Sequence, residues 1–252
     1  MIVSRREKIS KYITDMGEVS IRSLEKEFPD VSTMTIRRDL AYLEEQGLVI
    51  RTRGSVKSLL KLTGNGEDIY SLRATKNIDA KIKVAKKALK YVETGRSIFI
   101  DSGTTTMCLA KILPDDSLSI ITSGPNISME IIKKNNPSVT LVGGQLSRNN
   151  LTTSGMSSIN FIKSINIDIA FMAASAFSLK SGFTIGDFNE CELKKAVIKR
   201  AGKVVLMIDK SKIDKNMPFT FATLKDIDVL ISDSAFPEQY VEALKKNNVK
   251  IE

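Results

Sequence analysis

Apolar residues near the start of the chain recur every three or four positions, and this spacing predicts two short helices. Gly17 ends the first helix, Ser20 provides an N-cap for the second, and Pro29 ends the second. The residues of the two apolar stripes are Ile9, Ile13, Met16, Leu24 and Phe28.

A third helix is predicted from the N-cap Ser32 to about Gly47. On a helical wheel of about 100° per residue, Ile36, Leu40 and Leu43 fall within about 60° of one another and form its buried stripe. The sequence LVIRTRGSVK then predicts two short strands joined by a turn at its single glycine. Three helices followed by a small hairpin predict a winged helix-turn-helix.

Two adjacent arginines of the third helix point in different directions on this wheel. Arg38 and Met34 lie opposite the buried stripe, so Arg38 would face base edges if the helix entered a major groove. Arg37 lies about 100° away on a flank, where it suits a phosphate or an internal pairing with Asp39. The pattern therefore predicts two different roles for the pair.

Other candidates for nucleic-acid contacts lie at the start of this helix and on the hairpin. Hydroxyl groups at a helix N-terminus suit backbone phosphates, and basic hairpin residues suit the duplex backbone or the minor groove. An ordinary solvated charged face on a small helical domain would carry similar residues and stays an alternative. These candidates are Ser32, Thr33, Thr35, Arg51, Arg53 and Lys57.

The pattern changes after the hairpin. We expect a DNA-binding domain over 1–58, a linker over 59–75 and a larger domain over 76–252, which starts with an amphipathic helix marked by Ile78, Ile82, Ala85 and Leu89. Continuous apolar strands then alternate with helices, which predicts an α/β domain with a mostly parallel sheet covered on both faces. The strands are expected at 97–101, 118–122, 139–143, 167–173, 204–209 and 228–232, and the helices near 104–113, 126–135, 191–201 and 237–247.

One loop at the end of a predicted strand has the chemistry of a phosphate site. The segment IFIDSGTTT ends a strand and starts a helix, where backbone amides and hydroxyl groups can hold an anion. A well-capped helix without a ligand would look the same, and the Gly-Lys-Ser/Thr ending of a Walker A loop is absent. The candidate residues are Asp101, Ser102, Gly103, Thr104, Thr105 and Thr106.

Further polar groups follow other strands and converge on the same predicted sheet edge. The pair Gly143 and Gly144 permits close backbone approach to a ligand, or simply forms a turn. Lysines would balance a phosphate, and carboxylates would accept sugar hydroxyls or order the lysines. The charged candidates are Glu192 and Lys194 in NECELKK, which also contains Glu190, and Asp209 and Lys212 in MIDKSK.

Composition narrows the possible chemistry. The 252 residues are 42% hydrophobic and 27% charged, as in a soluble globular protein, and the formal net charge of +9 suits an anionic partner. Without histidine the chain has neither Ser-His nor Cys-His catalysis nor imidazole metal sites, and we expect no metal or other cofactor. Cys108 and Cys191 are interpreted as structural residues. The chain shows no signal peptide or membrane span, so we expect a cytoplasmic protein with no membrane partner.

Several of these motifs resemble those of one family. The string VSTMTIRRDLAYLEEQGLVIRTRG is similar to the DeoR-type helix-turn-helix, with Gly54 and Ser55 where that family often has paired glycines. The start of the larger domain, then LVGG, ECELKKAVI and IDKSK, resembles the DeoR sensor domain in order. The resemblance implies a sensor similar to the phosphosugar isomerase and CoA-transferase fold that binds a phosphorylated sugar. Ser123 stands where the family commonly has asparagine.

We therefore expect a sequence-specific DNA-binding transcriptional regulator and not an enzyme. It would repress a sugar or nucleoside catabolic operon, bind double-stranded operator DNA as a homo-oligomer (a dimer or a tetramer), and respond to a phosphorylated sugar. One alternative is a sugar-phosphate isomerase with an added DNA-binding domain, in which Glu192 or Asp101 would act as the base. The other is a constitutive DNA-binding protein whose sensor no longer binds a ligand. Fold does not imply activity, and the chain has no histidine for ring opening.

Overall fold

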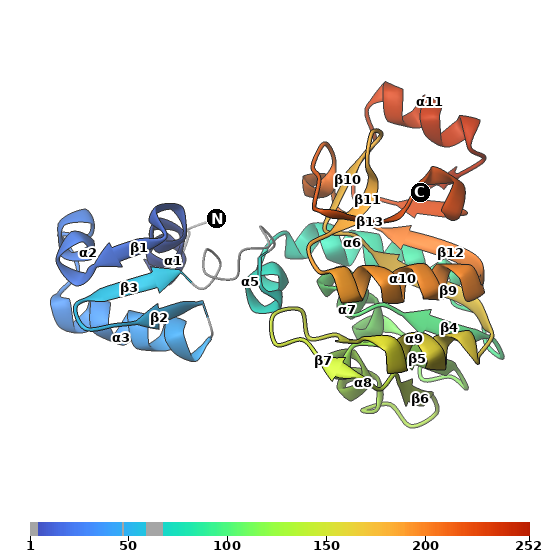
Figure 1. The fold of residues 1–252 in the computed structure, drawn as a ribbon, viewed down its shortest axis with the longest axis horizontal. Coiled ribbons are helices and arrows are strands. Elements are labelled where there is room, and N and C mark those ends of the chain that lie inside the picture. The colour runs from blue at the N-terminus through green and yellow to red at the C-terminus, as the bar shows by residue number, and fades with distance from the viewer. Residues whose placement is uncertain (1–4, 47, 59–67) are drawn as a thin grey trace. The chain divides into compact units, whose positions relative to one another are not determined.

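The computed structural model describes residues 5–46, 48–58 and 68–252. The chain divides into two compact units, Met1–Thr75 and Lys76–Glu252, and each is described by itself (Figure 1). The predicted helix end at Gly47 and residues 59–67 of the predicted linker lie outside the described residues. Among the described residues, no helix has both the length and the apolar character needed to cross a bilayer.

The first unit packs three helices on a small antiparallel sheet with the strand order β1-β3-β2. The hairpin β2–β3 was predicted and β1 was not, because a strand of three residues leaves no clear period. A short helix, α5, occupies residues that we had assigned to the linker. The elements are α1 (Arg5–Met16), β1 (Glu18–Ser20), α2 (Ile21–Glu27), α3 (Thr33–Glu45), β2 (Val49–Arg51), β3 (Ser55–Ser58) and α5 (Tyr70–Thr75).

The predicted caps and stripes organise this unit. The Ser20 and Ser32 side chains each accept a hydrogen bond from a backbone amide in the first turn of α2 and α3, as N-caps do. One residue of the predicted apolar stripe of α1 does not reach the core. Met16 is 60% exposed, because it is the last residue of α1 and the chain turns away at Gly17. The buried core consists of Ile9, Ile13, Val19, Leu24, Ile36, Leu40, Leu43, Val49 and Val56.

The second unit is built on a seven-stranded sheet in the order β15-β14-β12-β9-β4-β5-β6, and every neighbouring pair is parallel. Its strands are β4 (Ser97–Ile100), β5 (Ser119–Thr122), β6 (Ser138–Leu141), β9 (Ile167–Ala173), β12 (Ala201–Met207), β14 (Val229–Ile231) and β15 (Lys250–Ile251). Its helices are α6 (Ile78–Ala88), α7 (Thr104–Ile112), α8 (Pro125–Ile131), α9 (Met156–Lys163), α10 (Phe188–Arg200) and α11 (Glu238–Lys246). The predicted parallel α/β sheet is therefore confirmed.

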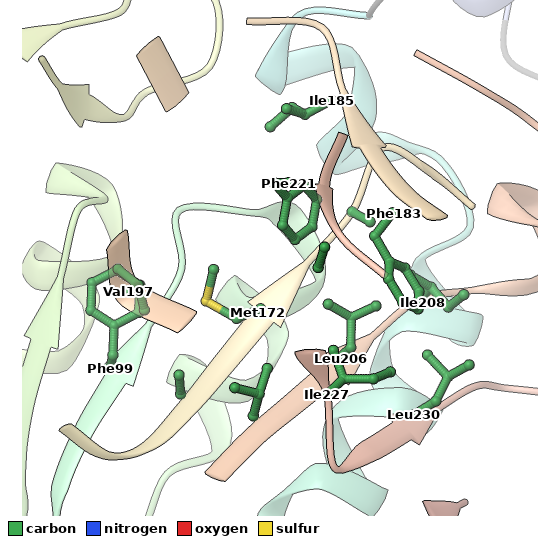
Figure 2. Packing of buried hydrophobic residues seen from close by; sticks show 14 of the residues in the cluster. Phe99, Met172, Phe183, Ile185, Val197, Leu206, Ile208, Phe221, Ile227 and Leu230 are labelled. Carbon is green, nitrogen blue, oxygen red and sulfur yellow. The ribbon is translucent and has the colours of Figure 1, made fainter. Parts of the chain in front are cut away.

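Alternate residues of the central strands feed two separate cores, as the two-residue period of a strand requires. Ile98 and Ile100 pack with α6, α7 and α8 on one face, while Phe99 packs on the other. Met172 and Leu206 lie in this second core with Val197 of α10 (Figure 2). Residues of α9 and α11 belong to the same core. Both faces of the sheet are covered, which explains why the strands read as continuous apolar runs.

A second sheet covers part of this unit and was not predicted. It has the antiparallel order β10-β11-β13, with β10 (Ala176–Ser178), β11 (Gly182–Ile185) and β13 (Phe219–Ala222). Phe177 and Phe183 stack with ring centroids 4.1 Å apart. Gly182 has a φ of +70°, and a Cβ there would lie 2.4 Å from the carbonyl oxygen of Ala222. The short β7 (Gln145–Leu146) and β8 (Thr153–Ser154) form a separate pair.

The predicted stripe of α6 was partly wrong. Ile78 and Ile82 are 48% and 37% exposed, and the buried side of the helix carries Lys81 and Val84 with two alanines. The Lys81 ammonium is buried and donates a hydrogen bond to the Lys76 carbonyl oxygen at 2.7 Å. A wheel built from apolar residues alone misses a lysine that is buried with a partner.

Leu40→Ala should lower the free energy of unfolding of the first unit by about 2–5 kcal/mol, because Leu40 is fully buried and its truncation leaves a cavity. Met34→Ala on the same helix removes a side chain that is 68% exposed and should change stability by less than about 0.5 kcal/mol. Urea unfolding followed by circular dichroism measures both, and equal losses would contradict this account of the α3 stripe.

Candidate functional site

The exposed side of α3 carries the predicted nucleic-acid contacts. Met34, Arg37 and Arg38 are exposed, while Ile36 and Leu40 on the opposite side are buried. The helical phase that separates the two arginines is therefore present in the structure. It directs Arg38 away from the core and Arg37 to a flank.

The hydroxyl groups at the start of α3 are partly engaged already. Ser32 Oγ and Thr35 Oγ1 lie 2.9 Å apart and share a hydrogen bond, and Ser32 Oγ also accepts one from the Thr35 amide at 3.3 Å. Thr33 is exposed. These contacts fix the first turn of α3, whose amides point toward any anion beyond the helix.

Two of the three hairpin cations have carboxylate partners. Arg51 donates hydrogen bonds from Nε and from its backbone amide to Glu44, at 2.6 and 3.0 Å, which lower the pKa of that carboxyl. Lys57 lies 3.3 Å from a Glu18 carboxylate oxygen. Arg53 is exposed beside the turn at Gly54, whose φ is +88°. Of these three side chains, Arg53 is therefore the best placed to meet a duplex without first leaving a partner.

The suggested pairing of Arg37 with Asp39 is not observed. Asp39 is fully buried and accepts hydrogen bonds from Arg5 and Arg6 of α1. The reason is the helical phase, because residues two positions apart on a helix point about 160° away from each other and Asp39 faces α1.

A second group of candidates lies where the large sheet changes direction. From β4 the chain adds β5 and β6 toward one edge, and it returns to β9 beside β4 before building toward the other edge. Ligands of open α/β sheets bind at the carboxyl ends of the strands at such a switch point. Asp101 follows β4 and accepts a hydrogen bond from the amide of Ala173, the last residue of β9, at 2.9 Å.

Asp101 also forms a buried ion pair with Lys194 of α10. The Lys194 ammonium donates a hydrogen bond to the Ala173 carbonyl oxygen at 3.1 Å and lies 3.6 Å from a Glu190 carboxylate oxygen. Asn150 donates to the other Glu190 oxygen at 2.9 Å. We call Asp101, Glu190, Lys194 and Asn150 the charged cluster. All four are at least nine-tenths buried, and buried charges at strand ends are more typical of function than of stability.

The loop after Asp101 combines packing with open donors. Ser102, Thr104 and Thr105 are buried, and Gly103 leaves no room for a side chain, since a Cβ would lie 2.8 Å from the Cβ of Ala173. Among the residues that the structure describes, no side chain caps the start of α7, so its first amides stay directed at the strand ends. Thr106 has a structural role, because its hydroxyl donates to the Asp101 and Gly103 carbonyl oxygens.

The structure separates the two glycines predicted near this edge. A Cβ on Gly143 would meet nothing within 4 Å, which leaves space beside its backbone. Gly144 has a φ of +137°, and a Cβ there would lie 2.6 Å from the Ser154 carbonyl oxygen, so this glycine is required by packing. The backbone conformation and close packing of the turn require glycine at position 144. Neither requires glycine at position 143, so close approach of a ligand stays the prediction for Gly143.

Glu192 lies outside the charged cluster, and its predicted contact with an effector stays a prediction. Its carboxylate pairs with Lys195 at 2.8 Å on the outer side of α10. Glu190 takes the inner position because it lies one helical turn before Lys194. This four-residue spacing in NECELKK was not used in the prediction, although it would have identified Glu190. Asn150 lies in an irregular segment and had no comparable signal.

Asp209 and Lys212 lie at the carboxyl end of β12, on the same sheet edge. Asp209 is buried, and its Oδ1 accepts hydrogen bonds from the Ser211 amide at 2.9 Å and from the Asn77 side chain at 3.3 Å. Its Oδ2 is buried without a partner among the described residues, as are both polar atoms of the Asn126 side chain. Unsatisfied buried polar atoms are uncommon and favour a site that a ligand or water completes. Lys212 is partly exposed.

Both cysteines have structural surroundings. Burial raises the pKa of Cys191 and of Cys108 despite nearby lysines, and each thiol donates to a backbone carbonyl oxygen. A raised pKa leaves little thiolate at neutral pH, which agrees with the structural interpretation.

The exposed basic side of α3 and the adjoining hairpin define the first unit as a DNA-binding winged helix-turn-helix. Comparison with known families agrees and extends to the second unit. The DeoR-like helix-turn-helix domain matches residues 5–61, and the DeoR C terminal sensor domain matches residues 76–234. The chain belongs to the DeoR family of transcriptional regulators.

Relatives match along almost the whole chain. The HTH-type transcriptional regulator GlpR of Haloferax volcanii is 30% identical over 98% of this chain and 96% of its own length. GolR of Listeria innocua is 33% identical over 91% and 90%. The glycerol-3-phosphate regulon repressor of Escherichia coli is 27% identical over 98% and 97%. All three are named as regulators, so the chain is placed with DNA-binding regulators and not with enzymes.

Solved structures resemble the chain more distantly. Ribose 5-phosphate isomerase A from Neisseria gonorrhoeae aligns over 53% of this chain and 52% of its own, with 17% identity and a TM-score of 0.38. Translation initiation factor eIF-2B from Pyrococcus horikoshii aligns over 65% and 66%, with 12% identity and a TM-score of 0.45. Similarity at this level carries no conclusion about ligand or activity.

Arg38→Ala should weaken specific operator binding by about 1–3 kcal/mol and relax the sequence preference at one base position, since Arg38 faces away from the core of α3. Arg37→Ala should weaken specific and non-specific binding alike. It should also lower the steepness of log Kobs against log salt by about one. Binding to a set of single-base operator variants at several salt concentrations measures both effects. Equal changes in specificity for the two variants would refute the division of roles.

Proposed function

We propose that the protein is a repressor of a sugar or nucleoside catabolic operon and that a phosphorylated sugar modulates its binding to operator DNA. The DNA-binding domain would comprise residues 1–58 and the sensor domain residues 76–252. The charged cluster at the switch point is the observation that carries the effector part, because buried charges gathered at the carboxyl ends of parallel strands favour a ligand site. The buried Oδ2 of Asp209, which has no partner among the described residues, adds an acceptor at the same sheet edge. A repressor acts where the chromosome lies, so the proposal places it in the cytoplasm.

The chemistry of this sheet edge suits a sugar phosphate. The uncapped start of α7, with the Ser102, Thr104 and Thr105 hydroxyls, would hold the phosphate. The carboxylates of Asp101 and Asp209 would accept hydrogen bonds from sugar hydroxyls. Lys194 lies between two carboxylates, so we assign it to positioning Asp101. Lys212, partly exposed at the same sheet edge, would add positive charge for the phosphate.

The names of relatives support the choice of ligand class. One is a glycerol-3-phosphate regulon repressor and another a putative aga operon transcriptional repressor. We also propose that the protein binds DNA as a dimer or tetramer, since two recognition helices related by a twofold axis match a palindromic operator.

The Asn77 side chain connects the proposed effector site to the first residues of the sensor domain. Asn77 donates hydrogen bonds to Asp209 Oδ1 and, at 3.0 Å, to Ser211 Oγ. Asn77 has a φ of +53° and lies two residues after Thr75, the last residue of the first unit. A ligand that binds Asp209 would alter this contact, and Asn77 would transmit the change toward the DNA-binding unit.

A panel of sugar phosphates should include one that raises the melting temperature of the protein with increasing concentration, by the equivalent of about 2.7 kcal/mol at a hundred times its Kd. Lys212→Ala should remove that rise and keep operator binding. Lys210→Ala, an exposed lysine in the same turn, serves as the matched control and should keep the rise. If no sugar phosphate raises the melting temperature, the protein is a constitutive DNA-binding protein and the effector proposal fails.

Asn77→Gly should separate ligand binding from the response of the operator. Glycine retains the left-handed backbone and removes the hydrogen bonds to Asp209 and Ser211. The melting-temperature rise should persist, while the change in operator affinity, about 1–3 kcal/mol in typical regulators, should shrink. Asn248→Gly is the control, because Asn248 is an exposed asparagine with a φ of +58° after α11. An unchanged response in Asn77→Gly would rule out this route.

A further inference from the structure

Two arginines that precede the helix-turn-helix motif in sequence lie against the flank of α3. Arg5 donates hydrogen bonds to the Asp39 carboxylate from Nε at 2.6 Å and from Nη2 at 3.3 Å. Arg6 donates to the same carboxylate from Nε at 2.9 Å. Asp39 itself is fully buried on α3, the helix predicted to enter the major groove and called the recognition helix below. Its carboxylate therefore holds both guanidinium groups at one position on that helix.

Tyr42 holds Arg6 on a second side. The guanidinium carbon of Arg6 lies 4.0 Å from the centroid of the Tyr42 ring, within the range of a cation–π contact. Tyr42 is 40% exposed, and on the helical wheel it lies about 40° from Arg38. Arg6 is therefore next to the face of α3 that carries Arg38, on the side opposite Arg37.

The charges of this group do not cancel. Two guanidinium groups face one carboxylate, and the arginine side chains remain 47% and 42% exposed. Asp39 engages only Nε of Arg6, and a guanidinium has five donors in a planar fork that fits phosphate. The result is an exposed, oriented positive charge beside a helix that enters DNA.

We propose that Arg5 and Arg6 bind backbone phosphates along one side of the major groove while α3 lies in it. Arg37 would take the phosphates on the other side, so the two flanks of α3 would together set its register. Asp39 and Tyr42 are positioning residues, because they hold the arginines in place before DNA arrives and thus lower the entropy lost on binding. The proposal concerns DNA alone and is independent of the effector.

The arrangement of Asp39 supports this role for the pair. Burial favours the neutral acid, but the hydrogen bonds and charges of Arg5 and Arg6 outweigh it and lower the pKa of Asp39. Asp39 is thus ionised at neutral pH and retains both arginines. Asp39 thus keeps both guanidinium groups beside the exposed face of α3.

The test uses the full chain and a duplex of mixed sequence, so no operator has to be known. Arg5→Gln and Arg6→Gln each remove one charge and keep an N–H donor for Asp39. Each should lower the steepness of log Kobs against log salt by about 0.9, the value for one phosphate contact. Lys11→Gln removes an equal charge from an exposed position of α1 and should leave the slope unchanged.

Asp39→Asn distinguishes a phosphate contact of Arg5 and Arg6 from a purely structural role of these arginines. It keeps both arginine charges but releases them, so affinity should fall while the slope stays as steep as in the wild type. If the glutamine variants keep the wild-type slope and lose affinity only as Asp39→Asn does, the arginines merely support α3 and the proposal is wrong. Circular dichroism melting confirms that each variant is folded. Should one glutamine variant unfold, the other decides, because each leaves Asp39 one arginine.

Discussion

The hydrogen bond from the Ala173 amide to Asp101 connects the two central strands of the large sheet at the point where its construction changes direction. Lys194 reaches this carboxylate from α10, so one buried group joins β4, β9 and a covering helix. The lengths of β4 and β9 and the phase of α10 must agree for this contact to exist. The start of α7 and the end of β12 are placed relative to it, and so is any ligand they bind.

Each unit contains a buried aspartate that is held by cations from another element. Asp39 connects α3 to α1, and Asp101 connects β4 to α10. Buried ion pairs contribute little net stability, because the cost of removing two charges from water offsets their attraction. They do fix orientation, since an aspartate without its partner would be expensive to bury. In this regulator both aspartates lie where orientation matters, on the recognition helix and at the proposed effector site.

The sequence predicted more of the fold than of the site. Periodicity located α3, its buried stripe and the alternating strands, because each pattern reflects which side of an element faces the core. The sheet β10-β11-β13 was not predicted because its strands are short and joined through irregular segments. Ile82 shows a related failure: it has the right spacing for a core residue, yet Lys81 is buried beside it with a backbone partner.

The sequence by itself determined the winged helix-turn-helix, the parallel α/β unit and the separation of Arg37 from Arg38, since these follow from local periods of 3.6 and 2 residues. Only the tertiary structure decided which charges meet. It brought Glu190 and not Glu192 to Lys194, gave Asp39 to Arg5 and Arg6, and set Asn77 against Asp209. Asp39 and its arginines, and Asn77 and Asp209, are far apart in the chain, while Glu190 and Glu192 differ only in the side of α10 that they occupy. Local periodicity does not decide such pairings, because the energy of a charge depends on what surrounds it in space.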